Sequence, residues 1–190
     1  MASYKPFFTD NNNLLNRWSE IAEKIRLFPT DRVLDMACAE GWISLWCAAV
    51  GTPIGGVKVV HGFDLDPFKI REAKKFDTQQ NEKMYRKKIS FGVRNIVNYN
   101  FPKTGLNQYD VILCLGILHK LTEREQILIL KKIFLQPARL IVIRVQDPKF
   151  KLMERITRLA SIGNFSLLRF KSRYPHQGDY YIFRKVFLPV

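Results

Sequence analysis

The chain has 190 residues, 47% of them hydrophobic and 25% charged, with a net charge of +14, a composition typical of one globular domain that binds polyanions rather than of a disordered chain. Its longest apolar run, 111–118, is far shorter than the roughly 20 residues that cross a bilayer, so we expect no transmembrane helix. The amino terminus reaches Asp10 and three asparagines before a signal-peptide core can form, and we therefore expect a cytoplasmic or nuclear protein.

The hydropathy pattern indicates the order of helices and strands. The first element is an amphipathic helix over 11–27, a flank or lid within residues 1–30, which ends at Pro29. A glycine- and proline-rich loop at 51–56 ends the second helix. In chain order we expect strand 32–35, a helix from about 41, strand 57–64, helix 67–85, strand 89–93, strand 109–115, helix 122–134, strand 138–145, helix 151–161, strand 165–170 and strand 179–186.

Two local signals support this order of elements, one at a helix start and one between the last two strands. The segment Thr122-Glu123-Arg124-Glu125 is a capping box, in which side chains satisfy the free amides of a helix start. The last two strands are joined only by the loop 172–178, so they should pair antiparallel, because a parallel connection needs a dozen or more residues. We therefore predict one α/β domain over 1–190, with a seven-stranded, mostly parallel, doubly wound sheet that ends in a C-terminal antiparallel hairpin.

A turn of small residues follows the first strand. Asp35 ends that strand and places a carboxylate at the carboxyl edge of the sheet, where open α/β folds bind ligands. Ala37, Ala39 and Gly41 let the backbone approach a ligand closely, although only Gly41 is free of the penalty for a positive φ. Such a turn also occurs for packing reasons alone, so its partners decide its meaning.

Segments after other strands complete a pattern. The turn at 35–41 resembles motif I of the class I S-adenosylmethionine-dependent methyltransferases, Asp-x-Gly-x-Gly-x-Gly, with alanines at two glycine positions. Residues 61–67, which contain Asp64, resemble motif II of that family. Residues 109–121 resemble its motif IV, including the Leu-His-x-Leu ending. The resemblance implies a Rossmann-like methyltransferase fold with S-adenosylmethionine as the cofactor.

The resemblance also implies roles for single residues. Asp64 matches the acid that accepts hydrogen bonds from the ribose hydroxyls of the cofactor, with Asp66 as a rival whose position favours a helix cap. Asn95 stands where the family has an acid for the adenine amino group; its carbonyl can accept the same bond, or it satisfies only the loop backbone. Ile117 and Leu118 should line the methyl-transfer pocket. The expected cofactor contacts are Asp35, Ala37, Ala39, Gly41, Asp64, Asn95, Leu115 and Gly116.

His119 is the only histidine at the predicted active edge. An imidazole near its ordinary pKa can take a proton from a hydroxyl or amine, so His119 is a candidate general base. The alternative is that it caps or packs the turn before the helix at 122. The motif IV segment lacks the Asn/Asp-Pro-Pro-aromatic signature, which disfavours methylation of an adenine amino group.

Charge bears on the substrate. Two basic segments, 69–88 and 139–185, favour RNA or another polyanion, and a solvated helix face is the alternative explanation. A methyltransferase for a small molecule and a non-catalytic protein of this fold that binds RNA or a protein are the other functions that the sequence allows. A partner subunit could also select the substrate.

Three cysteines, Cys38, Cys47 and Cys114, are an odd number and sit among apolar or small residues. This favours reduced thiols over disulfides. The three histidines are far apart in the sequence and form no ligand pattern with the cysteines, so we predict no metal site.

Overall fold

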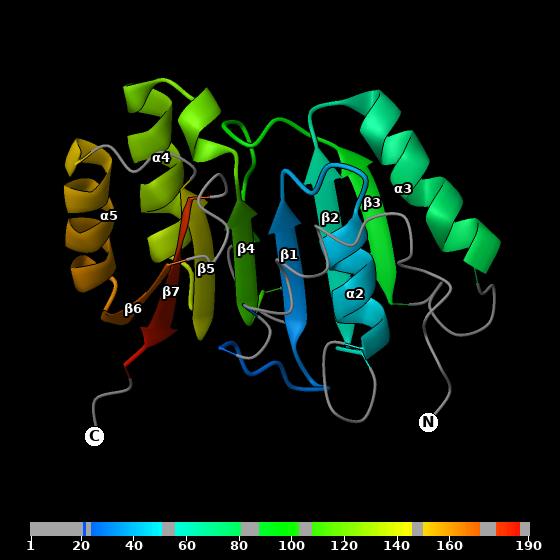
Figure 1. The fold of residues 1–190 in the computed structure, drawn as a ribbon, viewed down its shortest axis with the longest axis horizontal. Helices are drawn as coiled ribbons and strands as arrows, with labels where there is room; N and C mark the ends of the chain where they lie inside the picture. The colour runs from blue at the N-terminus through cyan, green and yellow to red at the C-terminus, as the bar shows by residue number, and fades with distance from the viewer. Residues whose placement is uncertain are drawn as a thin grey trace.

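Apolar segments pair into one seven-stranded sheet, with helices between most of the strands (Figure 1). The strands are β1 (Arg32–Met36), β2 (Val59–Asp64), β3 (Ile89–Val93), β4 (Val111–Leu115), β5 (Leu140–Val145), β6 (Phe165–Lys171) and β7 (Asp179–Lys185). The helices are α2 (Trp42–Val50), α3 (Pro67–Gln80), the 3-10 helix η3 (Leu118–Lys120), α4 (Glu123–Phe134) and α5 (Phe150–Ile162). The computed structural model describes residues 21, 24–50, 56–80, 88–102, 108–145, 150–171 and 178–186.

The strand order is β3-β2-β1-β4-β5-β7-β6. The strands β1 to β5 run parallel to one another, whereas β7 is antiparallel to both β5 and β6. The predicted fold, a mostly parallel sheet with a C-terminal antiparallel hairpin, is therefore confirmed. The chain order reverses between β1 and β4, and ligands of open α/β sheets bind at the carboxyl ends of the strands beside such a reversal.

Two cores lie on opposite faces of the sheet. Side chains alternate between the faces along a strand, so Val33 packs in the core that holds residues of α2 and α3, while its neighbour Leu34 packs in the core that holds residues of α4 and α5. The strands β4 and β5 are buried on both faces, as a doubly covered parallel sheet requires. Packing on both faces holds the strands in place, and with them the carboxyl edge of the sheet, where the candidate site lies.

Most predicted boundaries agree with the structure to within two residues. β3 and the end of α4 have the predicted bounds, whereas β2, β4 and β5 each begin two residues later than expected. The residues before β2 and β5 bond to turns instead: Lys58 N–H donates to the carbonyl of Asp31, and Arg139 N–H donates to that of Asp110. Hydropathy alone cannot separate such a lead-in from the strand that follows it.

The capping box of α4 is confirmed. Thr122 N–H donates to Glu125 Oε2 at 2.9 Å, and Glu125 N–H donates to Thr122 Oγ1 at 3.4 Å. The helix expected over 11–27 lies mostly outside the described residues. Residue 21 is helical, but 24–27 form a turn and irregular chain, so the predicted end at 27 is wrong. The predicted segments at 51–55, 81–87 and 172–177 also lie outside the described residues.

Cys38, Cys47 and Cys114 are buried free thiols, and burial raises the pKa of Cys114 to about 12. Among the described residues, no cluster of three or more histidine, cysteine or acidic side chains could hold a metal ion. None of the described helices is long and apolar enough to span a membrane.

Candidate active site

The small-residue turn after β1 has an unusual backbone. Ala37 and Ala39 have φ values of 59° and 51°, and Gly41 has a φ of 76°. These left-handed conformations cost a non-glycine residue about 1–2 kcal/mol, so the alanines keep a glycine backbone at the expense of stability. At Gly41 a side chain would not fit, because its Cβ would lie 2.6 Å from a ring carbon of Phe91.

Asp35 lies beneath this turn. Its side chain is 2% exposed, and its Oδ2 accepts a hydrogen bond of 2.6 Å from the hydroxyl of Ser44 in the first turn of α2. Burial, with a smaller contribution from the charge of Asp64, raises the pKa of Asp35 to about 6. Because the carboxyl is enclosed and bonded to α2, it can position the turn that follows β1.

Asp64 joins the two loops that follow β1 and β2. Its Oδ2 accepts from the backbone N–H of Ala39 at 2.9 Å, and its Oδ1 accepts from that of Asp66 at 3.0 Å. An ionised carboxylate offers about four acceptor positions, so two remain for a diol. The Oδ1 of Asp66 accepts instead from Phe68 N–H at 2.8 Å and caps α3, as predicted, so Asp64 stays the candidate for the ribose.

Residues at the ends of β2 and β3 complete this side of the edge. Asn95 is exposed, and its Oδ1 accepts from the backbone N–H of Val97 at 2.8 Å, so the structure shows the loop-bonding alternative; one lone pair of that oxygen is still available. Leu65 is 65% exposed, and Val93, which pairs with Asp64 in the sheet, is 52% exposed. Sequence reasoning missed these two residues, which offer a planar base an apolar contact.

The end of β4 is built differently. Gly116 follows Leu115 with a φ of 79°, which favours glycine. The expectation that Leu118 lines the methyl-transfer pocket is wrong, because its side chain is fully buried in the core that also holds residues of α4. Ile117 packs partly against the same core. The 3-10 turn points Leu118 inward and leaves its neighbour His119 exposed.

His119 neither caps a helix nor packs in a core within the described part of the chain. α4 is capped by Thr122, and no hydrogen bond of the His119 side chain to another described residue is present. Burial on one side, and then the positive charges of Lys120 and Arg144, lower the pKa of His119. A lowered pKa keeps the imidazole neutral at pH 7, which is the form that accepts a proton.

Arg144 lies beside the end of β4, a position that sequence reasoning missed. It pairs with Leu115 across β4 and β5, and a Cβ placed on Gly116 would lie 2.2 Å from its Nη2. The guanidinium therefore lies directly over Gly116. The signal was one charged residue within the otherwise apolar strand 140–145.

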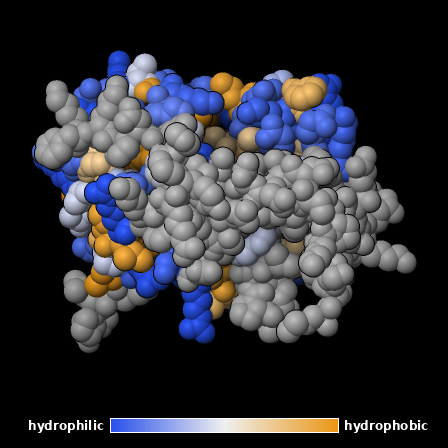
Figure 2. Space-filling view, viewed as in Figure 1, coloured by the Kyte–Doolittle hydropathy of each residue, from blue (hydrophilic) through white to orange (hydrophobic). Residues whose placement is uncertain are grey.

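The two basic segments have different surroundings. In the first, Arg71, Lys74 and Lys75 line a groove of about 450 Å³ together with Pro67, Ile70 and Val93. Hydrophilic residues cover α3 on the visible face of the molecule (Figure 2). In the second segment, three arginines have carboxylate partners, in the ion pairs Arg139–Asp31, Arg155–Glu123 and Arg169–Asp179. In the first, Lys75 is paired with Glu72 at 2.7 Å.

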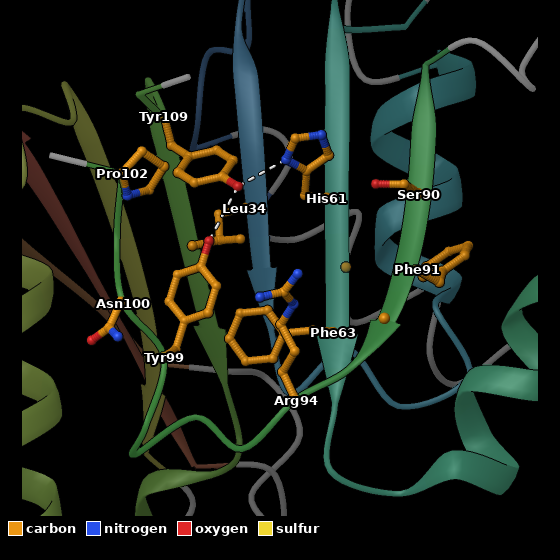
Figure 3. Close-up of a pocket in the computed structure, with 12 residues that line it drawn as sticks. Leu34, His61, Phe63, Ser90, Phe91, Arg94, Tyr99, Asn100, Pro102 and Tyr109 are labelled. Carbon is orange, nitrogen blue, oxygen red and sulfur yellow. Dashed lines mark hydrogen bonds between the residues drawn. The ribbon is translucent and has the colours of Figure 1, made fainter. Parts of the chain in front are cut away.

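A separate cavity of about 450 Å³ lies over β2 and β3, on the face that carries α4 and α5 (Figure 3). His61 Nδ1 and the Tyr109 hydroxyl are 2.8 Å apart, and the Tyr99 and Tyr109 hydroxyls are 3.2 Å apart. The β3–β4 connection contains no helix in its described residues, 94–102 and 108–110, so irregular chain borders this cavity. No predicted site residue lines it.

Comparisons with known proteins agree with this architecture. Residues 27–167 match a family described as "Methyltransferase domain", and no curated protein matches the chain. The methyltransferase domain of bacterial CtHen1 has 15% identity over 91% of this chain and 99% of its own, with a TM-score of 0.71. Magnesium protoporphyrin IX methyltransferase from Synechocystis, solved with S-adenosylmethionine, has 15% identity over 98% and 87%, with a TM-score of 0.68. Small RNA methyltransferase HEN1 has 16% identity over 100% of this chain and 27% of its own, with a TM-score of 0.73.

The residues at the carboxyl edge fit the cofactor of this family. The turn 37–41 keeps the left-handed backbone of the glycine motif, and Asp64 has acceptor positions to spare for a ribose. When bound, S-adenosylmethionine supplies a methyl group that its sulfonium has already activated. The matched family covers most of the chain. The chain therefore belongs to the methyltransferase domain family and is an S-adenosylmethionine-dependent methyltransferase.

Proposed function

We propose that this methyltransferase acts on RNA. The observation that carries the proposal is the basic groove on α3, formed by Arg71, Lys74 and Lys75, beside Val93 at the carboxyl end of β3. A phosphate backbone in this groove would run next to the cofactor edge. The net charge of +14 adds a sequence-independent attraction for polyanions.

Two of the similar folds belong to proteins described as RNA methylases, which supports the same substrate class. One is small RNA methyltransferase HEN1, and the other is a putative rRNA-methylase from Clostridium thermocellum, with 16% identity and a TM-score of 0.65. The magnesium protoporphyrin IX methyltransferase favours a small-molecule substrate instead. The position of the basic groove beside the cofactor edge supports RNA.

In this proposal the chain mainly aligns the reactants. Asp64 and the turn 37–41 hold the cofactor, so that its methyl group faces the ends of β4 and β5. His119, exposed at this edge and with a lowered pKa, takes the proton from the hydroxyl or amine of the acceptor. Little further chemistry is needed, because an activated methyl group requires chiefly in-line placement and exclusion of water.

The test is a triple variant of the groove, Arg71→Gln/Lys74→Gln/Lys75→Gln. A matched variant, Arg124→Gln/Lys131→Gln/Arg158→Gln, removes equal charge from exposed positions of α4 and α5. RNA binding is measured against salt concentration, and RNA methylation with labelled cofactor. The groove variant should lose affinity, and the slope of log K against log salt should fall by about 2, while binding of S-adenosylhomocysteine stays unchanged.

Two results would contradict the proposal. Equal losses of RNA binding in both variants would mean that the net charge matters and the groove does not. Methylation of a small molecule that is insensitive to salt, with no methylation of RNA, would favour the small-molecule alternative. Binding of RNA without methyl transfer to any RNA would favour the non-catalytic one.

A further inference from the structure

One cation lies over the end of β4. In the strand Leu140–Val145, Arg144 is the only charged residue, and the other five are fully or almost fully buried. A Cβ on Gly116 would lie 2.2 Å from Arg144 Nη2, 3.1 Å from Cζ and 3.2 Å from Nε. The guanidinium therefore approaches Gly116 with its Nη2 end, and the missing side chain at Gly116 makes room for it.

The described residues do not neutralise this guanidinium. The Nε of Arg144 is buried and has no hydrogen-bond partner among them. Other arginines of the same basic segment do have carboxylate partners: Arg139 pairs with Asp31 and Arg169 with Asp179. Buried polar groups are almost always satisfied, so an unsatisfied one needs an explanation.

The surroundings of Arg144 are positive. The charges of Arg144 and Lys120 both act on His119, whose pKa is lowered first by burial and then by these two cations. The carboxylates of the edge, Asp35 near the end of β1 and Asp64 at the end of β2, lie on the other side of the strand reversal. A planar guanidinium in such a place matches a phosphate or carboxylate, which it can bind through two parallel hydrogen bonds.

We propose that Arg144 forms an anion subsite at the acceptor side of the active edge and holds a phosphate or carboxylate of the substrate over Gly116, next to His119. The inference rests on the proposed function in one respect, since it assumes that the acceptor binds at the end of β4. It adds that the acceptor carries an anionic group close to the atom that receives the methyl group.

The test follows the imidazole resonances of His119 by NMR while inorganic phosphate is added, with and without S-adenosylhomocysteine. In the unaltered protein, phosphate should shift these resonances saturably. In Arg144→Met the apparent Kd for phosphate should rise by about tenfold or more, which is the loss expected for a charge-assisted bond. The control Arg158→Met removes equal charge from an exposed position of α5 and should leave the Kd unchanged.

A second measurement separates binding from a structural role. Because Arg144 Nε lacks a partner among the described residues, Arg144→Met should keep or raise the thermal midpoint while it weakens phosphate binding. A lower midpoint with unchanged phosphate affinity would assign Arg144 a structural role and overturn the proposal. If the methionine variant does not fold, Arg144→Lys keeps the charge without the planar fork and should show an intermediate Kd.

The source of the anion is distinguished by parallel titrations with acetate and with a short single-stranded RNA. A shift with RNA that depends on Arg144 assigns the subsite to an RNA phosphate, and a shift with acetate alone assigns it to a small carboxylic acid. If phosphate binding depends on Arg144 but RNA is not methylated, the proposed substrate fails and the subsite stands. If phosphate binds Arg144→Met as well as it binds the unaltered protein, the subsite fails whatever the RNA assay shows.

Discussion

The two halves of the carboxyl edge carry opposite charges. Asp35 lies near the end of β1, Asp64 ends β2, and Asp66 follows. Beyond the reversal between β1 and β4, Lys120 lies in η3 after β4 and Arg144 lies near the end of β5, and both cations act on His119. One edge of one sheet therefore offers hydrogen-bond acceptors on the cofactor side and donors on the acceptor side. Acceptors suit a neutral ribose diol, whereas donors suit an anion.

The two sides also differ in how their loops are stabilised. On the cofactor side, Ala37 and Ala39 are held in left-handed conformations, and Asp35 is a buried carboxyl with a raised pKa. On the acceptor side, α4 begins with a complete capping box at Thr122. Strained backbone conformations and a buried carboxyl both lower the stability of the fold. Binding sites commonly retain such features because the function needs them. The comparison leads to four measurements.

The largest effect is expected on the acceptor side. His119→Ala should lower turnover by about 10²–10⁴-fold, the usual contribution of a general base, with little change in cofactor affinity. Because burial and two cations lower its pKa below the ordinary 6.5, turnover in the unaltered protein should fall only below that pH. Equal losses of turnover and cofactor affinity would show that His119 belongs to the cofactor side instead.

The next effect concerns the buried carboxyl of Asp35. Its folded-state pKa of about 6 exceeds the ordinary 3.8, so its contribution to stability is complete below pH 3.8 and is lost as the pH rises through 6. This difference corresponds to about 3 kcal/mol.

Asp35→Asn stays neutral and can still accept a hydrogen bond from Ser44. The variant should therefore be more stable than the unaltered protein at pH 8 by up to that amount, and the two should converge near pH 4. Urea unfolding at both pH values measures the free energies. A stability difference that does not change with pH would mean that ionisation of Asp35 does not destabilise the fold. The two sides of the edge would then not differ in this respect.

Asp64→Ala tests the acceptors of the cofactor side. Removal of its charged hydrogen bonds to the ribose should weaken S-adenosylmethionine and S-adenosylhomocysteine by about tenfold to a hundredfold, measured by calorimetric titration. Asp66→Ser, which preserves the cap of α3, is the matched control and should bind normally. A larger loss in the control would transfer the ribose role to Asp66.

The smallest effect is expected from the left-handed alanines. Ala37→Gly and Ala39→Gly should each stabilise the protein by about 0.5–1 kcal/mol, because relief of backbone strain exceeds the added entropy of the unfolded chain. The same change at Ala48, in α2, should destabilise it by about 1 kcal/mol. Thermal unfolding measures all three. If the first two variants are also less stable, the turn is not strained.

The sequence alone determined the order of the elements, because alternation, capping and turn residues are local properties. The pattern predicted β3 and the end of α4 at their observed bounds, and the short last loop predicted the antiparallel hairpin. The positions of Asp35 and Asp64 were also predictable, since each lies at the carboxyl end of a strand in a recognisable motif. The rival role of Asp66 as a helix cap is confirmed by its bond to Phe68.

Only the tertiary structure decided which residues of neighbouring strands lie next to each other. Gly116 and Arg144 meet because β4 and β5 pair in one register, and no local pattern contains that pairing. Leu118 is buried while His119 is exposed because a 3-10 turn, rather than a strand, follows Gly116. Side-chain position depends on register and packing between distant segments, so the end of β4 could be located from the sequence, but the arginine that lies over it could not.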